Sequence, residues 1–198
     1  NEIGFHLNQP HSLLVKYIDS LNLEKNNRIF LPLCGKSLDI HWLLAQGYHM
    51  IGIDLSPIAI EELMAELAIP FTERKLEKLT HYHHPQIDLF VGDFFELTSS
   101  HIGKIDAIYD RAALVALPEE MRTDYAQHLM QISNQATQLL ISFEYDQSVM
   151  AGPPFSISPQ QLKDYYSKQY QLQLLDSQTE LLKGKVDAEE KIWLLKPY

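Results

Sequence analysis

The segment 28–56, RIFLPLCGKSLDIHWLLAQGYHMIGIDLS, decides how the rest of the chain is interpreted. Its first apolar run ends before Gly35, apolar residues then recur at helical spacing, and Gly47 stands where a helix is expected to stop. A second apolar run, 50–53, closes with Asp54. A strand, glycine turn, helix and strand, with an acidic residue about 20 positions past the turn, is typical of doubly wound α/β folds that grip a nucleotide ribose.

Further apolar runs and helix signals continue this alternation along the chain. Ser56 followed by Pro57 predicts one helix start, and Pro118 predicts another. Buried strands are predicted at 87–91, 105–109 and 138–143, and two closing strands at 170–174 and 191–195. This order predicts one α/β domain over residues 1–198, with a mostly parallel sheet covered on both faces. The last two strands lack an intervening helix, so an antiparallel edge is expected.

Composition narrows the class of protein. The 198 residues are 45% hydrophobic and 21% charged, which is ordinary for a globular domain. A net charge of −10 would repel a phosphate backbone, so we expect no nucleic-acid partner. One cysteine allows no internal disulfide, and no apolar run approaches the roughly 20 residues of a membrane helix. We therefore expect a cytoplasmic protein without a membrane partner, although the chain begins at Asn1 and a targeting segment upstream stays open.

Three cofactor classes compete for the segment 33–54. The letters GKS from Gly35 match the end of a phosphate-binding P-loop, but the required first glycine would fall at Phe30. A dinucleotide fingerprint needs three glycines and this turn has one, so a pyrophosphate would meet Cys34 and Lys36. A cofactor without phosphate tolerates a bulkier turn and keeps the ribose acid. S-adenosyl-L-methionine is such a cofactor.

Longer motifs carry a resemblance to a known family. They are PLCGKS at 32–37, GID at 52–54, GDFF at 92–95, YDRAALVAL at 109–117, and YDQ at 145–147 with GPPF at 152–155. Together with IGFH at 3–6, they make the chain resemble the thiopurine S-methyltransferase family from residue 3 to about 155. The resemblance implies a three-layer Rossmann-like methyltransferase fold, with a mostly parallel seven-stranded sheet and an antiparallel edge strand. It also implies a monomer that transfers a methyl group from S-adenosyl-L-methionine to sulfur, leaving S-adenosyl-L-homocysteine.

The same resemblance assigns cofactor contacts at matched positions. Asp54 would bind the ribose hydroxyls, Asp93 would contact the adenine, and the Leu33 backbone would lie near the methionine part. Further cofactor contacts are implied at Gly35, Leu55, Phe94 and Arg111. The acceptors implied are small thiols such as thiopurines, and also selenium and tellurium compounds.

The acceptor side depends on two other residues. Arg111 is implied between cofactor and thiol, where a guanidinium favours the thiolate, and it is our predicted catalytic residue. Phe5 is implied in the substrate pocket, within an N-terminal arm, 1–11, that lies over the active site. A purely structural alternative pairs Arg111 with Asp110. The roles of Lys183 and Lys185 are left open.

Several other patterns receive structural interpretations. Asp54 could cap the following helix, although Ser56 is better placed for that. Cys34 is interpreted as a packing residue, because no histidine partner is specified near it. The segment 79–82 is open to interpretation as a strand that turns through 83–86. Alternating His81 and His83 on such a hairpin invite a metal site, but no acid or cysteine pattern accompanies them, so we predict a solvated loop and no metal.

Two alternative functions remain on this fold. A nicotinamide-dependent oxidoreductase shares the ribose acid but would need the missing glycines. A catalytically silent nucleotide-binding module would bind the cofactor and transfer no methyl group.

Overall fold

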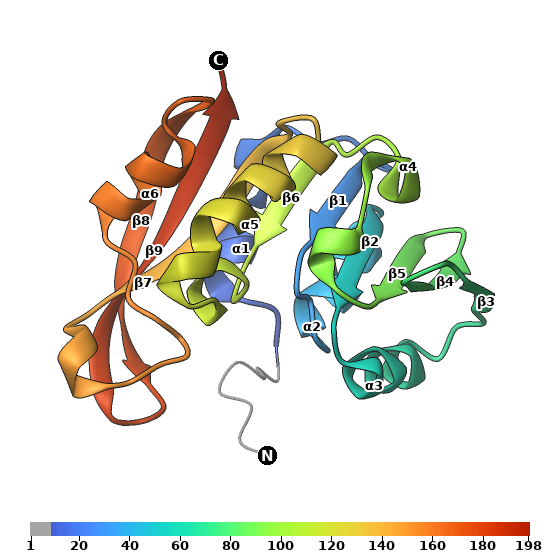
Figure 1. The fold of residues 1–198 in the computed structure, drawn as a ribbon, viewed down its shortest axis with the longest axis horizontal. Coiled ribbons are helices and arrows are strands. Elements are labelled where there is room, and N and C mark those ends of the chain that lie inside the picture. Colours follow the sequence, from blue (N-terminus) through green and yellow to red (C-terminus); the bar gives the residue numbers. More distant parts are fainter. Residues whose placement is uncertain (1–8) are drawn as a thin grey trace.

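The computed structural model of the protein describes residues 9–198, and within them one mixed sheet is covered by helices on both faces (Figure 1). The strand order is β3-β4-β5-β2-β1-β6-β7-β9-β8. The strands are β1 Arg28–Leu31, β2 His49–Asp54, β3 Thr72–Lys75, β4 Thr80–His84, β5 Ile87–Val91, β6 Ala107–Asp110, β7 Thr137–Glu144, β8 Tyr170–Leu182 and β9 Val186–Pro197.

The helices connect these strands in the order expected for α/β units. They are α1 Ser12–Tyr17, α2 Leu38–Ala45, α3 Pro57–Leu67, α4 Ser99–Ile102, α5 Glu119–Ile132 and α6 Pro159–Tyr166, with short 3₁₀ helices η1 Ile18–Leu21, η2 Phe94–Glu96, η3 Leu114–Ala116 and η4 Gln147–Val149. None of the helices within residues 9–198 is both long and apolar enough to cross a membrane.

The sheet is parallel in its centre and antiparallel at both edges. Strands β5, β2, β1, β6 and β7 run parallel, β9 and β8 are antiparallel at one edge, and β4 and β3 at the other. The α/β fold class is confirmed, but the described residues form nine strands rather than the predicted seven. The two extra strands fall in segment 71–86, where polar side chains on an edge hide the strand pattern.

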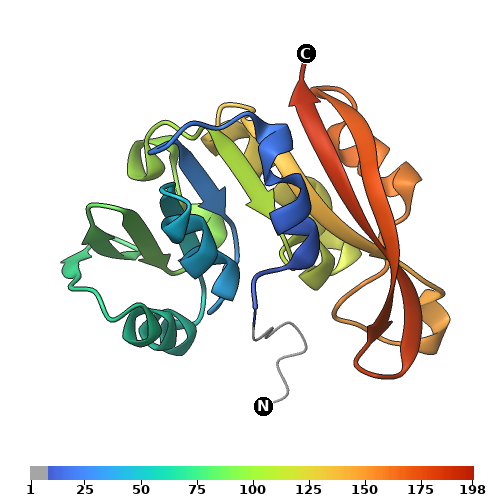
Figure 2. The same cartoon turned by 180° about the vertical axis from the view of Figure 1, so that it is seen from behind.

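Each face of the sheet has its own apolar core. One core packs sheet residues such as Phe30 and Ile51 against Leu129 of α5 and Leu162 of α6. The other packs the opposite side of the same strands against α1, α2 and α3, as the view from behind shows (Figure 2). Buried side chains on both sides explain why the central strands read as continuous apolar runs.

The two predicted helix starts are confirmed. Ser56 caps α3 with Pro57 in its first turn, and Pro118 directly precedes α5. Ser37 caps α2, and His11 caps α1, where its ring accepts the Leu13 N–H. Because the central strands are parallel, the turns after β1, β2, β5 and β6 all lie at the carboxyl ends of these strands. The predicted site residues follow these strands.

Candidate active site

Asp54 ends β2 and is held by backbone N–H groups on both of its oxygens. Gly35 donates to Oδ2 at 2.8 Å and Ser56 donates to Oδ1 at 2.8 Å. The turn before Gly35 reaches Asp54 through left-handed backbone at Leu33, with φ +47°. The Ser56 hydroxyl accepts the Ala59 N–H, so Ser56 caps α3 and Asp54 does not. The orientation of the Asp54 carboxylate is therefore fixed at the carboxyl end of β2.

A small, mostly apolar pocket lies beside Asp54. Its volume is about 130 Å³, and it is lined by Leu33, Ile53, Asp54, Leu55, Gly92, Asp93, Phe94, Phe95, Leu117, Met121 and Tyr125. Four of the predicted cofactor contacts besides Asp54 are thus brought together around one space. Leu55 lies at the open side of this pocket and is 73% exposed.

Asp93 and Phe94 have structural contacts as well as a place in this pocket. Asp93 caps η2 by accepting the Phe95 N–H at 3.0 Å. The Phe94 ring is buried and stacks on Phe30, with ring centroids 6.5 Å apart. These contacts hold the GDFF segment in the shape that lines the pocket.

A second hollow adjoins the first at Leu33. It measures about 290 Å³ and is lined by Leu31, Leu33, Cys34, Gly35, Lys36, Ser37, Arg111, Ala112, Ala116 and Pro153. Burial, and then the charge of Asp54, raise the pKa of the Cys34 thiol well above its usual range. Cys34 is therefore a packing residue, as predicted, because a nucleophile needs the thiolate.

Arg111 follows β6, and its side chain is 10% exposed. Its Nη1 lies 3.6 Å from Oδ2 of Asp39, a residue of α2. Asp39 is itself buried and also accepts the Tyr109 hydroxyl at 3.1 Å and the His11 N–H at 2.7 Å. The structure thus adds Asp39 to the site, a residue that sequence reasoning missed because its partner lies 72 positions away in the printed chain.

Asp110, the alternative partner, is occupied elsewhere. It accepts the Tyr125 hydroxyl at 2.8 Å and the Leu114 N–H at 3.2 Å. Burial raises the pKa of Asp110 to about 6, although these hydrogen bonds oppose the shift. Asp110 therefore bonds to Tyr125 and Leu114, whereas Arg111 forms an ion pair with Asp39.

Arg111 also borders a third, more polar hollow of about 160 Å³. Its other lining residues are His11, Ser12, Phe143, Gln178, Glu180, Leu181, Leu182, Lys183 and Glu190. Glu190 is fixed there by His11 Nε2 at 2.9 Å and by Gln178 at 2.8 Å. Lys183, whose role the sequence left open, also lines this hollow. Arg111 thus borders two separate hollows.

The predicted N-terminal arm is described only in part, and a hollow near the start of α5 carries none of the predicted site residues. Phe5 and positions 1–8 of the predicted arm lie outside the described residues, and of the arm only 9–11 are described. This further hollow, of about 570 Å³, lies between the start of α5 and the segment 144–158. Its residues Arg122 and Phe155 contact each other, with the guanidinium carbon 5.4 Å from the ring centre.

Comparison with known proteins decides the family. The family model for thiopurine S-methyltransferase (TPMT) matches residues 1–196. The chain belongs to the thiopurine S-methyltransferase family. A thiopurine S-methyltransferase of Acinetobacter baylyi is 51% identical, over 90% of this chain and 84% of that protein. One from Xanthobacter autotrophicus is 44% identical, over 97% of this chain and 91% of that protein. The family resemblance drawn from the motifs is confirmed.

Solved structures agree with this family at the level of fold. A SAM-dependent methyltransferase of Anabaena variabilis has a TM-score of 0.63 at 17% identity, covering 94% of this chain and 84% of that chain. One from Methanosarcina mazei has a TM-score of 0.67 at 12% identity, covering 96% and 99%. Such low identities establish the fold alone, and the Rossmann-like methyltransferase fold is the one they establish.

Proposed function

We propose that the protein transfers a methyl group from S-adenosyl-L-methionine to the sulfur of small thiols such as thiopurines. Membership of the thiopurine S-methyltransferase family supports this reaction. The observation that carries it is the place of Arg111, which borders both the hollow next to the Asp54 turn and the polar hollow beside Glu190. A group transfer between two bound molecules needs the reacting atoms close together and in line, and a side chain that borders both spaces can align them.

The residues around Asp54 fit this cofactor. Both oxygens of Asp54 are oriented by backbone N–H groups and keep lone pairs for the two ribose hydroxyls. The neighbouring apolar pocket suits an adenine ring, with Asp93 at its border. The turn at Cys34 has no open glycine cradle for a pyrophosphate, which disfavours a nicotinamide cofactor and the oxidoreductase alternative.

When bound, the cofactor supplies an electrophilic methyl group on a sulfonium, so alignment and exclusion of water are the main tasks of the protein. Leu33 lines both hollows of the cofactor side and would keep the methionine part in line. Arg111 would attract the acceptor as its thiolate and hold the sulfur in place. The ion pair with Asp39 would hold the guanidinium of Arg111 where it borders both hollows.

Calorimetric titration with S-adenosyl-L-homocysteine, followed by a methyl-transfer assay on a thiopurine, tests this function. We expect saturable binding of one equivalent, no comparable binding of NAD, and a methylated product by mass spectrometry. Absence of binding would contradict the cofactor assignment. Binding without transfer to any thiol in a panel would instead support the silent nucleotide-binding module.

The range of acceptors is a finer question within the same reaction. Selenite and tellurite oxyanions, small thiols and thiopurines can be compared in one product screen. The hollow beside Arg111 is lined by two cations, Arg111 and Lys183, and by the carboxylates of Glu180 and Glu190, so its charge does not favour anionic acceptors over thiopurines, and the screen ranks them. We also propose that the protein works as a monomer, which light scattering at assay concentration tests.

A further inference from the structure

A second group of titratable side chains lies at the opposite end of β2 and β5 from Asp54. The segment that carries it was predicted as a solvated loop, and that prediction is wrong, because 80–84 forms β4. On a strand, His81 and His83 project to the same face. His83 is paired directly with Asp88 of β5 in the antiparallel register. The acid missing from the local sequence pattern is therefore supplied by the neighbouring strand.

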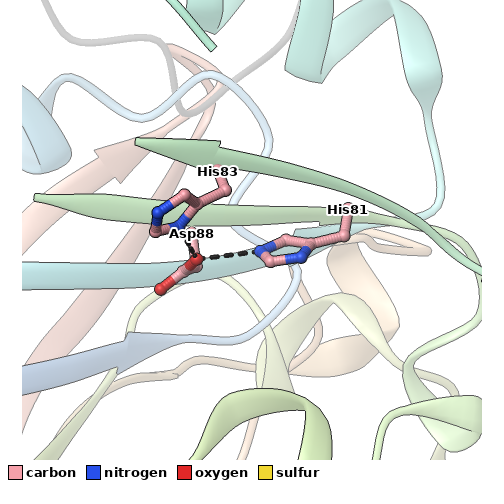
Figure 3. A group of neighbouring side chains, drawn as sticks. All are labelled: His81, His83 and Asp88. Carbon is pink, nitrogen blue, oxygen red and sulfur yellow. Dashed lines mark hydrogen bonds and ion pairs between the residues drawn. The ribbon is translucent and has the colours of Figure 1, made fainter. Parts of the chain in front are cut away.

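The two imidazoles converge on one carboxylate oxygen. Nε2 of His81 and Nδ1 of His83 each lie 2.8 Å from Oδ1 of Asp88, and Figure 3 shows both rings directed at it. All three ligand atoms lie within 4.8 Å of one another. Tetrahedral coordination at 2.0–2.2 Å separates ligand atoms by about 3.4 Å, so small side-chain rotations suffice to form a coordination triad. The protons on His81 Nε2 and His83 Nδ1 move to the other ring nitrogen or are released to water when the ion takes their place.

The other oxygen of Asp88 is fixed by different partners. His49 Nε2 lies 2.9 Å from Oδ2, and Arg28 Nη2 lies 3.5 Å from it. Arg28 pairs with Asp88 through Nη2 and is itself held by hydrogen bonds that it donates to the carbonyls of Ile102 and Lys104. Oδ2 is thus used to orient the carboxylate, while Oδ1 faces the two histidines.

Burial and ring stacking also hold the side chains of this cluster in place. The side chain of Asp88 is only 12% exposed, and that of His81 is 20% exposed. The His81 ring stacks on Phe90, with centroids 4.4 Å apart, which fixes the direction of its Nε2. The contacts of Asp88 and His81 thus hold two of the three ligand atoms in place before an ion binds.

We propose that His81 Nε2, His83 Nδ1 and Asp88 Oδ1 form a binding site for a divalent transition metal ion such as Zn²⁺. Two imidazoles and one carboxylate suit such an ion, whereas Mg²⁺ prefers an all-oxygen set. The half-exposed side chain of His83 opens the site to solvent, so water completes the coordination. The bound ion joins β4 to β5 and strengthens this edge of the sheet.

Titration of metal-free protein with Zn²⁺ tests the site. In calorimetry we expect one saturable equivalent, and in a thermal melt a gain of roughly 5–10 °C at 100 times the dissociation constant. Mg²⁺ at the same concentration should give no shift. Heat that never saturates, as expected from weak binding to scattered histidines, would overturn the proposal.

Matched variants on one strand separate a built site from general histidine binding. His83→Asn should weaken Zn²⁺ binding by more than the about 10–100-fold typical for a residue that only orients a ligand. His84→Asn is the control, because His84 neighbours His83 in sequence but contacts Phe71 on the other side of β4, with ring centroids 6.1 Å apart. Equal affinity of these two variants would overturn the proposal, provided that both melt like the parent protein in chelator.

Discussion

Asp54 and Asp88 lie on adjacent strands of the same sheet and are held in opposite ways. Asp54, at the carboxyl end of β2, accepts N–H groups of Gly35 and Ser56, its near neighbours in the fold unit. Asp88, at the amino end of β5, is held by side chains from β1, β2 and β4. Backbone donors cannot be exchanged for others, whereas side-chain donors can rotate. The first arrangement therefore suits a rigid cofactor grip, and the second suits an exchangeable ligand.

The largest effect is expected at the carboxyl end, for Arg111→Ala. Turnover with a thiopurine should fall by about 100–1,000-fold, as for loss of one group that stabilises a developing charge. Affinity for S-adenosyl-L-homocysteine should change much less, because Asp54 and its pocket are intact. Steady-state rates and calorimetry measure the two quantities separately. An unchanged rate would remove Arg111 from the chemistry and leave only its ion pair with Asp39.

A pH-dependent effect is expected from the buried Asp110, which accepts one backbone N–H and one side-chain hydroxyl. Its folded pKa of about 6 lies above the ordinary value of 3.8, so folding favours its protonated form. Stability from this group is fully present below pH 3.8 and is lost as the pH rises through 6. The difference in unfolding free energy between parent and Asp110→Asn should therefore fall by about 2.4 kcal/mol from pH 4 to pH 7.

Denaturant titrations of both proteins across this range measure that difference, since every other titrating group is shared. A flat difference would mean that solvent reaches Asp110 and that its pKa is ordinary.

A stability effect without a binding effect is expected at the amino end. In metal-free buffer, Asp88→Asn should lower the unfolding free energy by about 2 kcal/mol, because charge-assisted hydrogen bonds from three histidines are weakened. Urea unfolding at pH 7 measures this change. The dissociation constant for S-adenosyl-L-homocysteine should stay within about twofold, and a larger change would show that the two ends of the sheet are coupled.

The smallest effect is expected for Asp54→Asn, which keeps the shape of the side chain and removes its charge. We expect the dissociation constant for S-adenosyl-L-homocysteine to rise about tenfold, or about 1.4 kcal/mol. Asp54→Glu is the matched control, because it keeps the charge, and it should bind more tightly than Asp54→Asn. If both bind like the parent protein, the ribose contact is made elsewhere.

The contrast between local backbone contacts and side-chain contacts from other strands also explains which features the sequence predicted. Elements fixed by local signals were predicted, such as the Ser56 cap, the Gly35 turn and the strand before Asp54. The pairing of Arg111 with Asp39 and of His81 with Asp88 was missed, because each joins residues on different elements. Strand β3 was missed because its side chains are exposed and polar, so no apolar pattern marks it.

Strand β2 has a consequence for how the protein would respond to two ligands at once. Asp88, the proposed metal ligand on β5, pairs with Ile51 of β2, three residues before Asp54, or roughly 10 Å along the strand at 3.3 Å per residue. That separation exceeds the Debye length of about 8 Å at physiological salt. Ile51 and Ile53 of β2 are fully buried, each worth about 1.5–3 kcal/mol, so the strand does not slide. Metal and cofactor should therefore bind as independent events, with thermal shifts that simply add.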